Sequence, residues 1–307
     1  MNKSKGDFIS EIFKKLSHNK GKKTVFDKPR AYITGIPIIL WLLIIIITPV
    51  ILMLIMSFRQ KVGYDISYVL TLSNYLRILK KPLYFKIFLR SFRIALIASV
   101  LAIFAGYPLA YYISRKIRKG RNLLFMLIIT PLWISYLVRI IAWRTILGNR
   151  GLINSALMAL GLIKEPLSFL LYNQFAVAIT LTYIAIPFVF IPLYTTLEKI
   201  PVSLIDAAKD LGANEFQTFI NVIFPLSIPG LLTGFMLAFI VSLGDYIIPM
   251  QLGGTGGMMI GNIIWSQFGF AFNWPLGAAL GFILFSIAAV VLAIVQKLGS
   301  REGMIYE

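Results

Sequence analysis

The sequence of 307 residues has no cysteine, a single histidine and only twelve acidic residues. Without cysteine the chain cannot form a disulfide, a thiolate metal site or a thiol nucleophile. His18 alone cannot build a metal site or a catalytic triad, so no metal is expected in this chain. Charged residues amount to 14% of the chain, whereas a water-exposed surface carries about 25%. With 58% hydrophobic residues, most of the chain is expected to face lipid.

Thirty Lys and Arg residues against twelve acids give a formal net charge of +18. These cations gather at the borders of uncharged runs, with nine in residues 1–30 and five in residues 115–121. That distribution is typical of a membrane protein, so no nucleic acid partner is expected. Residues 1–30 are expected to be a basic cytoplasmic arm, either an amphipathic helix on anionic membrane lipid or an unstructured segment. A cleaved leader is not expected, because a secretory signal begins its apolar core within a few residues.

Long apolar runs predict an all-α polytopic membrane protein, because a spanning helix needs about 20 mainly apolar residues. A single transmembrane domain is expected over residues 31–300. Its six spans are expected at about 33–58, 92–114, 122–143, 174–195, 226–247 and 276–297.

The excess of Lys and Arg in cytoplasmic loops predicts the orientation of these spans. Residues 1–30, the loop 114–121 and the C-terminal end are basic and lie on one side of a six-span protein, so both termini are expected in the cytoplasm. Residues 59–93 disagree, since this expected external loop carries eight cations. Much of that charge lies in 77–93, where apolar and basic residues interleave as in an interfacial helix, so the other segments decide the orientation.

The segment 201–225, between the fourth and fifth spans, is expected to form a cytoplasmic helical hairpin. Ser203 and Asp206 have the spacing of a capping box for a helix that begins at the next residue, Leu204. Asn214 and Gln217 repeat the spacing for a second helix.

Glycine and proline positions mark the ends of this hairpin. Gly212 lies between the two helices, where a left-handed residue ends a helix without a side-chain clash. Pro225 and Pro229 are expected to stop the second helix before the fifth span.

The hairpin resembles the EAA motif of ABC-importer permeases (EAA, three residues, G, nine residues, I-x-L-P). The matching residues are Asp206, Ala207, Ala208, Gly212 and Pro225, with Asp in place of Glu and with Val222 and Phe224 in place of Ile and Leu. The resemblance implies the fold of a type I ABC importer permease, in which this hairpin is the coupling helix that docks into the ATPase. It further implies a second homologous permease subunit on a different chain, two cytoplasmic ATP-binding subunits and an external solute-binding protein.

Three further phrases are similar to the spermidine/putrescine permease subfamily, and the likeness extends over about residues 30–300. They are "NYLRIL" at 74–79, "GYPLAYYISR" at 106–115 and "SLGDYIIPMQLGG" at 242–254. The resemblance implies a bacterial inner-membrane location and a polyamine substrate. Related importers for ferric iron, thiamine or opines carry similar phrases, so these substrates remain alternatives.

No Walker A motif is found, because "GGTGGMMIG" lacks the Lys-Ser/Thr pair that holds phosphate and magnesium. The chain is therefore expected to be non-catalytic and without a cofactor of its own, with ATP and Mg bound by the partner ATPase. A secondary transporter is the alternative, but it needs coupling-ion carboxylates in its spans. Only one acid, Asp245, lies within residues 216–296.

Asp245 is the leading candidate for the substrate path, since an ionisable group at membrane depth is a functional hypothesis. Aromatic residues that can hold ammonium groups by cation–π attraction are Tyr246, Trp265, Trp133 and Tyr136. The alternatives are that Asp245 caps a helix and that the aromatic residues form interfacial belts. Arg139 and Arg144 would repel a polycation, so they are expected to snorkel to the membrane interface, unless the substrate is an anion.

Overall fold

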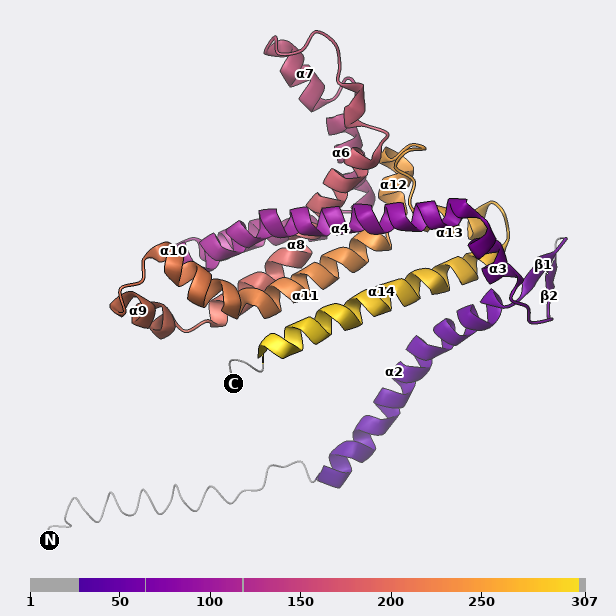
Figure 1. Ribbon diagram of the computed structural model, residues 1–307, viewed down its shortest axis with the longest axis horizontal. Helices are drawn as coiled ribbons and strands as arrows, with labels where there is room; N and C mark the ends of the chain where they lie inside the picture. The colour runs from indigo at the N-terminus through magenta and orange to yellow at the C-terminus, as the bar shows by residue number, and fades with distance from the viewer. Residues whose placement is uncertain (1–27, 64, 118, 304–307) are drawn as a thin grey trace. The chain divides into compact units, whose positions relative to one another are not determined.

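The computed structural model describes residues 28–303 apart from positions 64 and 118 (Figure 1). His18 and nearly all of the basic arm lie outside the described residues. Apart from a short antiparallel hairpin, β1 (Gln60–Val62) with β2 (Asp65–Ser67), the regular elements of the described part are helices. The expected all-α class is confirmed.

The chain divides into two compact units, residues 1–53 and 54–307. The described part of the first unit belongs to a single long helix, α2 (Lys28–Ser57). From Ile36 to Ser57 this helix is strongly apolar, and most of its large side chains are exposed. Such a helix has the length and composition to cross a membrane, where lipid would cover those side chains.

The core of the second unit is formed by three long helices that pack side by side (Figure 1). They are α4 (Pro82–Tyr111), α8 (Gln174–Lys199) and α11 (Phe224–Leu243). Glycine lets α11 approach α8 closely, because a Cβ atom at Gly230 would lie only 2.8 Å from the carbonyl oxygen of Pro192. Small residues at helix contacts are typical of membrane bundles, where close backbone approach replaces the hydrophobic effect between helices.

Shorter helices complete the second unit. They are α3 (Ser73–Lys80), α5 (Arg121–Ile129), α6 (Tyr136–Leu147), α7 (Leu152–Ala159), α9 (Val202–Asp210), α10 (Glu215–Thr218), α12 (Ile247–Leu252) and α13 (Ile260–Gly269). The last long helix, α14 (Trp274–Gly303), packs against α11 and α13. Single turns of π-helix or 3-10 helix lie at η2 (Tyr112–Lys116), η3 (Thr130–Trp133), η4 (Ser168–Leu170) and η5 (Phe219–Ile223).

By length and composition, five helices of the described chain can cross a membrane, or six if one bent pair counts as a span. The five are Ile36–Ser57, Pro82–Lys116, Gln174–Lys199, Glu215–Leu243 and Trp274–Lys297. The basic segment 77–93 is divided between α3 and the first turns of α4, with Pro82 as the first residue of α4. Proline suits that position because its missing N–H has no partner there in any helix.

The expected third span, 122–143, is not a single helix. Arg121–Trp133 and Tyr136–Ala159 meet at an angle of 96°. The first helix tightens into the 3-10 turn that contains Pro131, and Ile134 is then extended, with ψ of 138°. Proline lacks the N–H of the α-helical hydrogen-bond pattern, and the 3-10 turn that precedes the break begins beside Pro131.

Candidate functional site

The hairpin of α9 and α10 follows directly from the end of α8 (Figure 1). Gly212, between the two helices, has a φ of +87°, so the expected left-handed residue is confirmed. The N–H of Gly212 donates to the carbonyl of Lys209 at 2.9 Å, and the N–H of Ala213 donates to that of Ala208 at 3.0 Å. This pair of bonds is the Schellman motif, which satisfies the last carbonyls of α9.

One of the two expected capping boxes is present. The N–H of Gln217 donates to Asn214 Oδ1 at 2.8 Å, and the N–H of Asn214 donates to Gln217 Oε1 at 2.9 Å. The expected cap by Ser203 is wrong, because α9 begins at Val202 and no side chain caps it. The extended Pro201 precedes it, with φ of −61°, so the helix begins earlier and Ser203 lies inside its first turn.

The expected break at Pro225 and Pro229 is also wrong. The chain is helical without interruption from Glu215 to Leu243, through α10, η5 and α11. The π-helical turn η5 precedes Pro225, and it closes with the N–H of Phe224 donating to the carbonyl of Phe219. Such a turn changes the hydrogen-bond register by one residue, which lets the helix pass a proline. The hairpin is thus continuous with the predicted fifth span.

The hairpin exposes an apolar surface that we call the docking face: Leu204, Ala207, Leu211 and Phe216. Leu211 is 90% exposed and Phe216 is 73% exposed. Asp206 is exposed beside this face, Ala208 is half-buried, and Pro225 is half-buried in the helix behind it. Exposed apolar patches mark interaction sites. The sequence interpretation missed the leucines and the phenylalanine, although the seven-residue spacing of Leu204 and Leu211 places both on one helix face.

A second cluster lies where α11 ends and α12 begins. Asp245 is 9% exposed, and its Oδ1 accepts a hydrogen bond from the N–H of Ile248 at 2.9 Å. Its Oδ2 accepts a hydrogen bond from the hydroxyl of Tyr136, which comes from α6. The carboxylate therefore caps α12 and also ties two distant parts of the chain together.

The aromatic candidates divide into pairs. Tyr246 and Trp265 stack with ring centroids 6.2 Å apart and planes 14° apart. Gly261 permits this approach, since a Cβ atom there would lie 2.7 Å from the carbonyl oxygen of Asp245. Trp133 stays apart from them: it is 78% exposed and has no ring contact with another described residue.

Arg139 does not snorkel, so that expectation is wrong for this residue. It is 9% exposed, and its guanidinium carbon lies 5.4 Å from the ring centroid of Tyr136. Its Nε and Nη1 atoms have no hydrogen-bond partner within the described chain. Arg144 is exposed and donates to Gln251 and to the hydroxyl of Tyr172. Tyr136 thus lies between a buried cation and a buried anion.

The comparisons with known proteins agree with one another. A family model described as "Binding-protein-dependent transport system inner membrane component" matches residues 98–302. The spermidine/putrescine transport system permease protein PotB of Escherichia coli (strain K12) is 36% identical over 261 residues, covering 84% of this chain and 94% of that protein. Its counterpart in Haemophilus influenzae is 34% identical over 258 residues, covering 84% and 90%.

Among solved structures, a chain of a bacterial ABC transporter involved in the import of the polysaccharide alginate matches with a TM-score of 0.69. The match covers 95% of the chain described above and 99% of the other chain, at 18% sequence identity. This likeness concerns the fold.

Proposed function

Because the chain belongs to the family of binding-protein-dependent transport system inner membrane components, we propose that it is the permease subunit of an ATP-driven importer of polyamines, spermidine and putrescine. The observation that carries the substrate class is the 36% identity to a spermidine/putrescine permease over 84% of the chain. The buried carboxylate of Asp245 supports it, since a polyamine is a chain of ammonium groups.

The docking face supports the proposal that a separate ATP-binding subunit supplies the energy. Its exposed apolar side chains, with Asp206 beside them, suit a cleft of an ATP-binding subunit that offers apolar walls and a basic group. In this proposal Ala207 and Ala208 let the hairpin seat closely, Gly212 sets its bend, and Pro225 lies in the helix that carries the movement onward. ATP and Mg belong to that partner, and this chain is a non-catalytic transport subunit.

The complete machine has further partners in this proposal. They are a second, homologous permease on a different chain, two cytoplasmic ATP-binding subunits and an external binding protein that delivers the substrate. A solved structure of the alginate transporter in complex with its periplasmic protein, similar in fold at a TM-score of 0.66, supports the presence of such a protein.

Purified binding protein from the same transport system provides the test of the substrate class. Titrated by calorimetry against spermidine, putrescine, amino acids, thiamine, sulfate and iron chelates, it is expected to bind the two polyamines most tightly. Proteoliposomes that hold the complete transporter are then expected to accumulate labelled spermidine only with ATP inside. If the binding protein preferred an anion, the second candidate function, an anion importer, would be favoured. The buried Arg139 is the observation that supports this candidate.

The family places the chain in the inner membrane as a multi-pass protein. We predict that both termini and the loop 114–121 lie in the cytoplasm. A reporter fused after Glu307 and one inserted at 114–121 are expected to report the same side, and a tag at Gly254 the opposite side. Accessibility labelling of intact cells measures all three. A tag at Gly254 on the same side as the other two would contradict the orientation.

Gly212 provides a test of the hairpin bend. Its Cβ position has open space, so a substitution meets no clash, but a φ of +87° strains any β-branched residue by about 1–3 kcal/mol. Gly212→Val is expected to leave the permease inserted and to reduce uptake per ATP hydrolysed several-fold. Gly212→Asn is the matched control, because asparagine tolerates the left-handed region. Equal uptake per ATP in Gly212→Val and the parent would contradict a role for the bend.

A further inference from the structure

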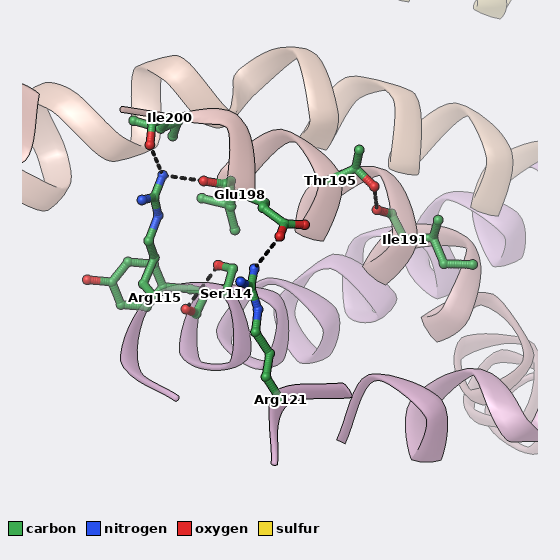
Figure 2. Close-up of polar contacts among 9 residues, drawn as sticks. Ser114, Arg115, Arg121, Ile191, Thr195, Glu198 and Ile200 are labelled. Atoms are coloured by element: carbon green, nitrogen blue, oxygen red, sulfur yellow. Dashed lines mark hydrogen bonds and ion pairs between the residues drawn. The ribbon is translucent and has the colours of Figure 1, made fainter. Parts of the chain in front are cut away.

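Arg115, Lys116 and Arg121 lie in the basic loop from which the sequence predicted only the orientation. They contact the end of α8, where the hairpin begins, and the first residue of α10. Arg115 extends from the end of η2 to the end of α8 (Figure 2). Its Nη2 donates to the carbonyl of Ile200 at 2.7 Å and to that of Leu197. The carbonyl of Leu197 also accepts the N–H of Ile200 at 3.3 Å. A cation at the end of a helix is favourable to the helix dipole.

Arg121 holds the same end of α8 from another side. Its Nη2 forms an ion pair of 3.0 Å with Oε1 of Glu198, as Figure 2 shows. Its guanidinium carbon also lies 5.0 Å from the ring centroid of Tyr194, one turn earlier on α8. Arg121 is the first residue of α5, so this contact joins α5 to α8.

Lys116 reaches the other arm of the hairpin. Its Nζ lies 3.0 Å from Oε2 of Glu215, the first residue of α10. The three cations therefore contact the chain where it enters the hairpin and again at the first residue of its second helix. A cavity of about 540 Å³ separates the basic loop from α9 and α10 between these contacts. These polar contacts lie around the cavity, and one apolar cluster that includes Ile117 and Ile205 also joins the two parts.

We infer that Arg115, Lys116 and Arg121 form a basic clamp that positions the hairpin and transmits its movement to α4 and α5. The inference rests on the proposed coupling role of the hairpin. Arg115 contributes most to the stability of the clamp, because hydrogen bonds from a charged donor to carbonyls are stronger than exposed ion pairs. The ion pairs of Arg121 and Lys116 have exposed acidic partners, Glu198 and Glu215, and so contribute less.

The complete transporter in proteoliposomes, with its ATPase, partner permease and binding protein, provides the functional test. Arg115→Leu is expected to lower spermidine uptake per ATP hydrolysed about tenfold. The uptake per ATP of Arg115→Lys is expected to lie between those of the parent and Arg115→Leu, since lysine keeps the charge but not the forked donor geometry. The control is Lys119→Glu, which reverses a charge in the same loop at an exposed residue with no hydrogen bond or ion pair to another described residue. It is expected to match the parent.

A charge exchange keeps the inference testable if Arg115→Leu fails to assemble. Arg121→Glu alone is expected to lower uptake per ATP about two- to threefold, and Arg121→Glu with Glu198→Arg is expected to restore it. Parental coupling in Arg115→Leu would overturn the clamp. If that variant does not assemble, failure of the exchange to restore coupling would overturn it.

A label experiment separates the clamp from the substrate proposal. Since the chain has no cysteine, Asn122→Cys on α5 and Asp210→Cys on α9 accept spin labels on this chain alone, once the other subunits are cysteine-free. Their distance distribution is expected to stay narrow with and without ATP, and to broaden when Arg115→Leu is added. This readout needs no substrate. If the parent imports no polyamine and Arg115→Leu still broadens the distribution, the polyamine is rejected and the clamp is kept. A distribution unchanged by Arg115→Leu would reject the clamp.

Discussion

Leu211→Asp is expected to abolish ATP-driven uptake and to release the ATPase subunit from the permease. The side chain is 90% exposed, so its replacement does not disturb the packing of the isolated chain. Burying a leucine against a partner contributes about 1.5–3 kcal/mol, and its loss alone weakens association about 10- to 150-fold. A buried, unpaired carboxylate adds a further penalty.

Co-purification of the ATPase with the detergent-solubilised permease measures this effect, and uptake in proteoliposomes measures its consequence. Leu211→Met is the matched control, because it keeps an apolar side chain of similar volume and is expected to retain the ATPase. Phe216→Ala is expected to weaken the association in the same direction, since Phe216 belongs to the same docking face. Undiminished recovery of the ATPase with Leu211→Asp would show that the partner binds elsewhere.

Asp245→Asn is expected to reduce polyamine uptake strongly while the complex still assembles. The asparagine oxygen can still accept the N–H of Ile248, and its amide can still bond the hydroxyl of Tyr136, so the local structure is retained. What disappears is the negative charge. Loss of one partner from a desolvated charge pair costs about 2–5 kcal/mol, although this cost is smaller in a hydrated passage.

Two further variants separate charge from structure at this site. Asp245→Glu keeps the charge and is expected to retain much of the uptake. Tyr136→Phe removes the hydroxyl that donates to Asp245 but leaves its carboxylate, so it tests the structural contact alone. Uptake of spermidine by Asp245→Asn at the parental rate would reduce Asp245 to a helix cap. If Arg139→Ala abolished uptake at the same time, the passage would be one for an anion.

Local signals in the sequence were enough to predict much of the structure of this protein. Apolar runs of about 20 residues predicted the all-α membrane class, because lipid leaves a helix as the simplest way to satisfy every backbone group. Gly212 and the pair Asn214 and Gln217 predicted a turn and a cap correctly, since those bonds span at most five residues. The spacing around Asp206 indicated the family in the same way, because a motif of consecutive helix turns is a local pattern.

The tertiary structure decided whatever depends on residues far apart or on how a helix continues past a proline. Pro225 lies inside a continuous helix because a π-helical turn precedes it, whereas Pro131 lies where a helix ends, and proline by itself does not distinguish these outcomes. Asp245 and Tyr136 are 109 residues apart and meet only through the packing of α6 near α12. Arg115 reaches a carbonyl 85 residues away by the same kind of contact. A charge in a sequence predicts its side of the membrane from composition alone, but its partner depends on three-dimensional packing.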